Sequence, residues 1–204
     1  MITIVDYGLG NINAFLNVYR RLNVQAKTAR RADDLQDASK VILPGVGAFD
    51  HAMTRLTQSG MREALDDLVL RRRVPVLGVC VGMQMLGRDS DEGSLPGLGW
   101  IDGRVRSLAA LIPAAALPVP HMGWNDVRPT VASTLFDRLG SAARFYFLHS
   151  YYFECDRDDD ALARADYGGA FACAVNSRNV FGVQFHPEKS HHYGVQLLKN
   201  FAEM

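Results

Sequence analysis

The sequence predicts an α/β protein, in which a mixed, mostly parallel sheet carries helices on both faces. Short apolar runs alternate with segments of helical spacing through the first half of the chain. These runs are continuously apolar, as expected for strands buried on both faces of a parallel sheet. The length of 204 residues suits one α/β domain with a full core, so we expect a single domain over residues 1–204.

Each element of the first half follows from its local pattern. The predicted strands are residues 2–5, 24–28, 41–43 and 74–79. The predicted helices are residues 13–22, 32–38 and 61–70. Loops at Gly8, Gly45 and Cys80 follow three of these strands. Because ligands bind beyond the carboxyl ends of parallel strands, we expect these loops to converge on a site.

The second half has a different pattern. Its short β-like runs predict antiparallel additions to the sheet, around residues 121–125, 145–148, 172–175 and 180–183. The stretch 107–120 is rich in Ala, Leu and Pro and predicts a surface loop. Residues 193–201 predict an amphipathic terminal helix. The sequence contains no internal repeat or linker, which favours one domain.

Composition excludes several function classes. The 22 basic and 22 acidic residues balance, so no basic surplus indicates nucleic-acid binding. Three cysteines form an odd, sparse set, which argues against a disulfide framework and for a reducing compartment. We recognise no signal peptide and no run of about 20 apolar residues that could span a bilayer. These features predict a cytoplasmic protein without a membrane anchor.

Cys80 lies in the segment G-V-C-V-G, between an apolar run and a predicted helix. Gly78 and Gly82 permit a sharp strand-to-helix turn, as in the nucleophile elbow of hydrolases. The turn places the sulfur at a helix N-terminus, where partial positive charge favours thiolate over thiol. The pattern predicts a cysteine nucleophile, although a tight turn with a buried, inert cysteine fits the same letters.

A base for this cysteine follows a second apolar run, at His186-Pro187-Glu188. A nucleophilic cysteine needs a group to take its proton, and that group needs an orienting partner. His186 can serve as the base, and Glu188, two residues on in an extended segment, can point the same way. A hydrogen-bonded surface histidine is the alternative for His186.

A metal site is a weaker interpretation. His186, His191 and His192 are close in sequence, but no cysteine or carboxylate at ligand spacing completes a tetrahedral set. We therefore expect no metal and no cofactor.

Taken together, the motifs resemble the class I glutamine amidotransferases, which carry a Cys-His-Glu triad. More closely, the chain resembles the glutaminase subunits of imidazole glycerol phosphate synthases. The resemblance runs from end to end, and P-H-M-G-W-N with P-G-V-G separates these subunits from other members of the class. The matching segments are D-Y-G-L-G-N at 6–11, L-P-G-V-G-A-F at 43–49, G-V-C-V-G-M-Q-M-L at 78–86, D-E-G at 91–93, G-L-G at 97–99, P-H-M-G-W-N at 120–125, Y-F-L-H-S-Y at 146–151 and Q-F-H-P-E-K-S at 184–190.

The resemblance implies a flavodoxin-like fold and a specific chemistry. Cys80 attacks the side-chain amide carbon of L-glutamine, His186 moves the proton and Glu188 holds His186. Backbone N–H groups stabilise the oxyanion, from Val81 and from the Val46–Gly47 loop. The alternative for this loop is an ordinary turn after a strand. The resemblance also assigns glutamine binding to Gly45, Gln84, His149, Ser150 and Tyr151.

The resemblance implies a partner as well. Glutaminase subunits of this kind form a heterodimer with a (βα)8-barrel cyclase, which receives the ammonia and makes imidazole glycerol phosphate and AICAR in histidine biosynthesis. Docking residues by resemblance are Asn11, Trp124, Tyr146 and Lys189, although the two aromatic residues are equally plausible in the core.

Two positions depart from the family pattern. Pro118 replaces a basic residue that usually precedes the P-H-M-G-W-N segment, which bears on docking. Val81 replaces the usual leucine, a change that is harmless if only its amide is used. Related subunits supply ammonia to synthases that amidinate surface sugars, so that role remains an alternative. A non-catalytic scaffold for the barrel is a third reading, against which the intact triad argues.

Overall fold

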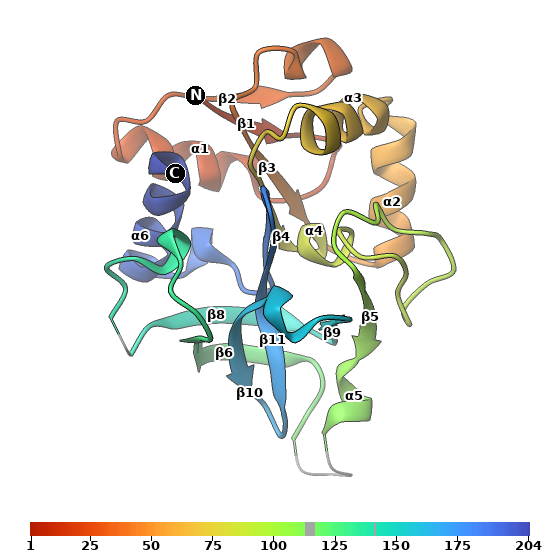
Figure 1. Ribbon diagram of the computed structural model, residues 1–204, viewed down its shortest axis with the longest axis vertical. Coiled ribbons are helices and arrows are strands. Elements are labelled where there is room, and N and C mark those ends of the chain that lie inside the picture. Colours follow the sequence, from red (N-terminus) through yellow and green to blue (C-terminus); the bar gives the residue numbers. More distant parts are fainter. Residues whose placement is uncertain (113–116, 141) are drawn as a thin grey trace.

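The computed structural model describes residues 1–112, 117–140 and 142–204 (Figure 1). The strands are β1 (Ile2–Val5), β2 (Ala26–Ala29), β3 (Lys40–Gly45), β4 (Val76–Cys80), β5 (Gly103–Ser107), β6 (His121–Asp126), β7 (Arg128–Pro129), β8 (Arg144–His149), β9 (Tyr151–Cys155), β10 (Ala161–Asp166), β11 (Ala170–Ser177) and β12 (Val180–Val183). The α-helices are α1 (Ile12–Arg21), α2 (Phe49–Gln58), α3 (Arg62–Asp66), α4 (Val81–Gln84), α5 (Leu108–Leu111) and α6 (His191–Glu203). Short 3₁₀ or π turns are η1 (Ala32–Leu35), η2 (Asp67–Arg71), η3 (Thr134–Phe136), η4 (Asp158–Asp160) and η5 (Pro187–Lys189).

A mixed sheet forms the centre of the molecule, which confirms the predicted fold class. Its main path runs β2-β1-β3-β4-β12-β11-β10-β7, and β9 and β5 attach beside β11. The neighbouring pairs from β2 to β12 are parallel, whereas β11, β10 and β7 continue antiparallel. The carboxyl ends of β1, β3, β4 and β12 therefore lie on one edge of the sheet.

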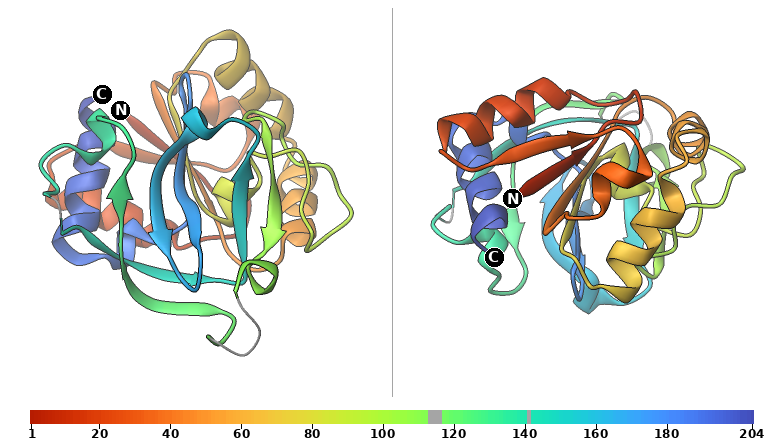
Figure 2. Two further views of the ribbon diagram at one scale, coloured as in Figure 1. Left: turned by 60° about the horizontal axis from the view of Figure 1, so that its bottom comes forward. Right: turned by 90° about the horizontal axis from the view of Figure 1, so that it is seen from above.

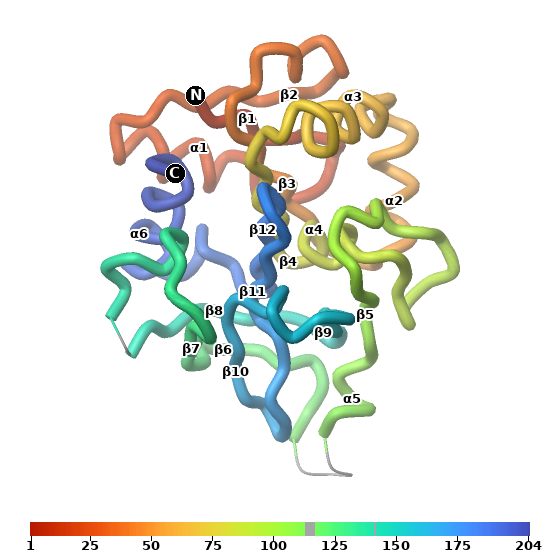
Figure 3. The backbone as a smooth tube through the Cα atoms, viewed as in Figure 1, coloured from red at the N-terminus to blue at the C-terminus, as the bar shows by residue number. Residues whose placement is uncertain are grey.

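One strand pairs differently from its sequence prediction. Residues 180–183 were expected as an antiparallel addition, but β12 pairs parallel with β4, with Val180 opposite Val76 (Figure 3). It is antiparallel only to β11, from which a tight turn leads into it. This central position brings the end of β12 beside the end of β4.

The segments around 121–125 and 145–148 do not join the main sheet as expected. Strands β6 and β8 form a separate two-stranded ribbon, with Trp124 opposite Tyr146, and it runs across the main strands (Figure 1). Alternation explains the difference. Phe145 and Phe147 are fully buried on one side of β8, whereas Leu148 faces out with 36% exposed. The ribbon thus covers the core with one face only.

Helices cover both faces of the parallel part of the sheet (Figure 2). Helices α1 and α6 pack on one face, where the Tyr19 hydroxyl donates to the Leu198 carbonyl at 3.2 Å. Helices α2 and α3 lie on the other face. Helix α2 was not predicted, although Phe49, Met53 and Leu56, all buried, have helical spacing.

Several predicted bounds change for local reasons. Strand β2 begins at Ala26 rather than residue 24, because the Val24 amide closes the end of α1 on the Tyr19 carbonyl. The predicted helix at 32–38 is the shorter turn η1, and the one at 61–70 is divided between α3 and η2.

The stretch 107–120 is only partly the surface loop that was expected. Residues 117–120 are exposed, but Leu108 begins α5 and is fully buried, because its amide bonds to the Ser150 carbonyl and its side chain enters the core. Residues 113–116 of this prediction lie outside the described residues. In the part of the chain that the structure describes, no helix has the length and apolar character to cross a membrane. A single domain over 1–204 stays a prediction.

Candidate active site

Cys80 is the last residue of β4 and lies in a strained turn. Its φ of 56° and ψ of −115° fall in a region that a non-glycine residue rarely adopts. The glycines on either side are required by packing. A Cβ at Gly82 would lie 1.9 Å from the Leu43 carbonyl oxygen, and one at Gly78 would lie 2.6 Å from the Gly82 oxygen. The predicted sharp turn is therefore confirmed, although α4 begins at Val81 and is only one turn long.

We expect Gly82→Ala to disrupt this turn. The added methyl overlaps backbone that is fixed in the sheet, so the free energy of unfolding should fall by about 3 kcal/mol or more. Chemical denaturation measures the loss. Gly60→Ala is the matched control, because its Cβ would meet no atom within 4 Å and only its φ of 71° opposes the change. It should lose about 1 kcal/mol, and equal losses in the two variants would contradict the packing argument.

His186 and Glu188 meet at the carboxyl end of β12. His186 Nδ1 lies 2.9 Å from Glu188 Oε1, and the two side chains are 4% and 3% exposed. Glu188 was expected in an extended segment, but it lies in the 3₁₀ turn η5. This turn begins at Pro187, whose ring fixes φ. Burial lowers the pKa of His186, but hydrogen bonds to Cys80 and Glu188 outweigh burial and raise this pKa to about 9.

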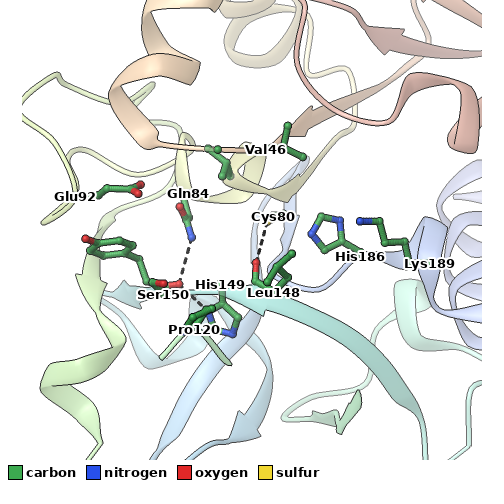
Figure 4. Close-up of a pocket in the computed structure, with 13 residues that line it drawn as sticks. Val46, Cys80, Gln84, Glu92, Pro120, Leu148, His149, Ser150, His186 and Lys189 are labelled. Carbon is green, nitrogen blue, oxygen red and sulfur yellow. Dashed lines mark hydrogen bonds between the residues drawn. The ribbon is translucent and has the colours of Figure 1, made fainter. Parts of the chain in front are cut away.

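The sulfur of Cys80 has further neighbours. It lies 3.9 Å from the Leu148 carbonyl oxygen, and the Gln184 side chain donates to it at 3.8 Å. Figure 4 shows the His186 ring beside Cys80 at one pocket, and the hydrogen bond from His186 to Glu188 adds an orienting carboxylate to this base and nucleophile. With its side chain 4% exposed, His186 is not a surface histidine, which was the alternative for this residue.

The loop after β3 approaches the same turn. Gly45 pairs with Cys80 in the sheet, and a Cβ on Gly45 would lie 2.5 Å from the Gly82 amide nitrogen, so only glycine fits. Gly47 is required for a different reason, since its φ is 85° and a Cβ there would meet nothing. Val46 and Gly47 face Val81 across a pocket.

This pocket has a volume of about 300 Å³ and opens beside Cys80 (Figure 4). It brings together most of the predicted substrate-binding residues, except Gly45, which lies behind it. Its lining residues are Val46, Gly47, Cys80, Val81, Gln84, Glu92, Pro120, Leu148, His149, Ser150, Tyr151, His186 and Lys189.

Sequence reasoning assigned no role to Glu92, although the D-E-G segment drew attention to its position. The Glu92 carboxylate points toward the pocket in Figure 4, and its Oε2 accepts from the Phe49 amide at 2.8 Å. Glu92 thus links the pocket to the start of α2. The sequence signal was the D-E-G segment at 91–93, a carboxylate in the loop between α4 and β5.

Comparison with known proteins shows the family to which the chain belongs. A family model described as glutamine amidotransferase class-I matches residues 3–204. The chain belongs to the class I glutamine amidotransferases. Its curated relatives extend over the whole amidotransferase chain, so the match covers more than the motifs.

Two relatives are named "Imidazole glycerol phosphate synthase subunit HisH". The protein from Bdellovibrio bacteriovorus is 62% identical over 204 residues, and the one from Leptospira interrogans is 52% identical, each covering 100% of both chains. A Pseudomonas aeruginosa relative, 47% identical over 100% of both chains, is named "Imidazole glycerol phosphate synthase subunit HisH 2". Among solved structures, PurLQS from Thermotoga maritima has a TM-score of 0.73 at 16% identity, covering 99% of this chain and 97% of that one. This structural likeness supports the fold alone.

His149 plays a structural part in the amidotransferase that the sequence did not indicate. Its Nδ1 lies 2.8 Å from the Tyr151 carbonyl oxygen and its Nε2 lies 2.9 Å from His121 Nδ1. A carbonyl only accepts, so Nδ1 of His149 carries the proton and Nε2 accepts from His121. His121 Nε2 then accepts from Asn125 Nδ2 at 3.3 Å. With both ring nitrogens used, the His149 ring has no free polar atom for substrate.

Both histidines are neutral in the folded amidotransferase. Burial lowers the pKa of His121 to about 4 and that of His149 to about 3. A histidine whose folded pKa lies below its unfolded value stabilises the fold above the unfolded pKa and loses that contribution as pH falls. We therefore expect the free energy of unfolding to decline between about pH 6.5 and pH 4.5, by up to about 1.4 kcal/mol per pH unit for each histidine.

Denaturation at a series of pH values measures this slope. His121→Gln should lower the slope of unfolding free energy against pH by the contribution of one proton. His51→Gln, at an exposed position, should leave this slope unchanged. A slope that His121→Gln does not alter would show that the neutral histidine pair is not its cause.

The predicted docking residues of the amidotransferase divide into two groups. Trp124 is 38% exposed and stacks on His191 at 5.2 Å, and Tyr146 is half-buried opposite it, so neither is a core aromatic. Lys189 lines the pocket. Asn11 accepts from the Ala14 amide at 3.3 Å and caps α1.

Among the residues that the structure describes, no three His, Cys, Asp or Glu side chains gather in a possible metal site.

Proposed function

We propose that this protein is the glutaminase subunit of an imidazole glycerol phosphate synthase in histidine biosynthesis. It would hydrolyse glutamine to glutamate and ammonia through a thioester on Cys80, and pass the ammonia to a (βα)8-barrel cyclase subunit. The observation that carries the proposal is that Cys80 and His186 line one pocket, with His186 held by Glu188 at 2.9 Å. Full-length relatives named as HisH subunits support the choice of pathway.

The chemistry follows from the positions of these groups. His186 accepts the thiol proton, and the sulfur attacks the side-chain amide carbon of glutamine. The raised pKa of His186 makes it a base strong enough to hold this proton and then give it to the leaving nitrogen. Ammonia departs, and a γ-glutamyl thioester remains. His186 then takes a proton from water, whose oxygen attacks the thioester, and glutamate and the free thiol result.

The negative oxygen that forms in both steps needs fixed donors. The Val81 amide is one, because Val81 directly follows the nucleophile and lines the pocket. The backbone of Val46 and Gly47 lines the opposite side and supplies the second. The left-handed φ of Gly47 permits this peptide to turn without strain from a side chain.

Polar groups at the other end of the pocket suit the amino-acid part of glutamine. Gln84 donates its amide N–H groups to the Tyr151 carbonyl and to Gln184, which leaves its oxygen for an ammonium group. Glu92 adds a negative charge at the same end. Ser150 and Tyr151 would bind the substrate carboxylate through the serine hydroxyl or backbone.

The charge of Glu92 gives a test of substrate orientation. Glu92→Gln keeps an oxygen that can accept from the Phe49 amide but removes the negative charge. We expect KM for glutamine to rise by about tenfold or more, with kcat changed much less, since the lost ion pair acts on the bound substrate and transition state alike. Steady-state kinetics measure this, with the exposed Glu63→Gln as control. A loss confined to kcat would contradict the assignment.

The rim of the pocket supports docking of a partner. Apolar side chains lie exposed on and just before β6, with Met122 at 60%, Val119 at 41% and Trp124 at 38%, and Met122 pairs with Leu148 of the pocket lining. Together with Tyr146, Lys189 and Asn11 they would contact the cyclase and exclude water from the ammonia path. Pro118 lies beside this rim, and its carbonyl accepts from the Tyr167 hydroxyl at 2.8 Å, so the departure from the family pattern falls at the proposed docking surface.

The test is glutamate release by the purified protein, alone and with the barrel cyclase of the same genome plus its nucleotide ligand. Strong stimulation by this cyclase supports the proposal. Activity that ignores this cyclase but responds to a sugar-amidinating synthase would favour the alternative acceptor. A complex that uses only free ammonia would favour the scaffold.

A further inference from the structure

Gln184 is a fully buried polar residue to which the mechanism above gives no role. It follows β12 directly and precedes His186 by two residues. Its backbone amide donates to the Cys173 carbonyl at 2.8 Å, which fixes the chain at this point. A buried amide is costly unless its groups are hydrogen-bonded, so the partners of this side chain are informative.

The orientation of the Gln184 amide is determined by a chain of hydrogen bonds. The Tyr151 carbonyl can only accept, so the group of Gln84 that lies 3.2 Å from it is the amide nitrogen. The same nitrogen lies 3.0 Å from the Gln184 side chain, whose oxygen must therefore face it. The nitrogen of Gln184 is then directed at Cys80 Sγ, at 3.8 Å.

We propose that Gln184 donates this N–H to the sulfur of Cys80 and stabilises its negative charge before attack. A hydrogen bond to an ionised acceptor is about twice as strong as one between neutral groups, and burial strengthens it further. His186 and Gln184 would then act on the sulfur together, one as base and the other as a fixed donor. Gln184 also accepts from Gln84, which lines the substrate pocket, so the donor is linked to the pocket.

The inference rests on Cys80 being the nucleophile of the proposed function, but its test does not require glutamine turnover. Iodoacetamide alkylates a thiolate directly, and the peptide that contains Cys80 can be followed by mass spectrometry across pH. Gln184→Met keeps a similar volume without a donor. We expect alkylation of Cys80 at pH 7 to slow by about tenfold and the pH profile to move upward.

A second variant tests whether the side chain at this position acts on the sulfur. Gln184→Glu keeps an oxygen that can accept from Gln84, but an ionised carboxylate beside the sulfur opposes the thiolate. If Gln184 acts as a donor, both variants move the alkylation profile upward and lower kcat for glutamine. A wild-type profile in Gln184→Glu would show that the side chain at this position does not act on the sulfur, and this result overturns the inference.

The control is another buried amide far from the site. Asn200 donates to the carbonyls of Leu135 and Asp137, and Asn200→Leu should lower the stability while the alkylation profile of Cys80 stays unchanged. Wild-type alkylation in Gln184→Met rejects the inference even if the protein is an active glutaminase. If Gln184→Met does not fold, Gln184→Glu alone supplies the result. Absence of glutamine turnover in the wild-type complex rejects the proposed function and leaves this measurement intact.

Discussion

Cys80→Ala is expected to abolish glutamine-dependent activity in the complex with the cyclase. In the proposed mechanism the sulfur forms the covalent intermediate, and no other cysteine is among the described residues that line the pocket. Loss of the nucleophile of such a triad costs a factor of about 10⁴ or more in turnover. Glutamate release, measured with and without the cyclase, should fall to background.

The same variant carries its own control. Added ammonia bypasses the glutaminase, so ammonia-dependent synthesis by the Cys80→Ala complex should match the wild-type complex. Equal loss of both activities would show that Cys80 maintains the structure of the complex rather than the supply of ammonia. Cys155→Ala, at a half-buried cysteine outside the pocket, should leave both activities intact.

His186→Ala should reduce turnover nearly as much as Cys80→Ala, whereas Glu188→Gln should reduce it less. The first removes the base, and the second removes only the group that orients it and helps to raise its pKa. In related triads the orienting carboxylate contributes a factor of about 10 to 100 less than the base. Steady-state turnover of glutamine by the complex measures the order of the two effects.

The pH dependence gives a second readout for Glu188→Gln. Because the Glu188 carboxylate raises the pKa of His186, its removal should lower the pH at which kcat depends on His186. Lys199→Gln, on the outer part of α6, serves as a charge-changing control away from the pocket. If Glu188→Gln is more damaging than His186→Ala, the assignment of base and orienting group is wrong.

Much of the fold could be predicted because local pattern and tertiary structure agree in the parallel half. Residues 41–43, for example, are apolar throughout and end at a glycine-rich loop, so their burial on both faces could be predicted from the sequence. The turn at Cys80 was predictable for the same reason, because glycine at 78 and 82 is the local signature of a close backbone approach. The contact between His186 and Glu188 was predicted, although the turn η5 makes it rather than the expected extended segment.

Other features depend on long-range contacts that a single sequence does not display. The β6–β8 ribbon was misplaced, since short alternating strands do not reveal which sheet they join. The role of His149 could not be predicted, because its partner His121 is 28 residues away along the chain. Gln184 and Glu92 were missed for a similar reason. Gln184 contacts Cys80 and Glu92 contacts Phe49, and only the fold brings these residues together.

The central claim is that Cys80 forms a covalent bond to glutamine in this pocket. The most direct measurement is peptide mass mapping after reaction with a chloroketone analogue of glutamine. We expect one adduct, on Cys80, which glutamine protects and His186→Ala slows. Cys173 is fully buried, and burial raises the pKa of Cys155 to about 12, so neither should compete. Labelling of another residue, or labelling of Cys80 that glutamine does not prevent, would contradict the account.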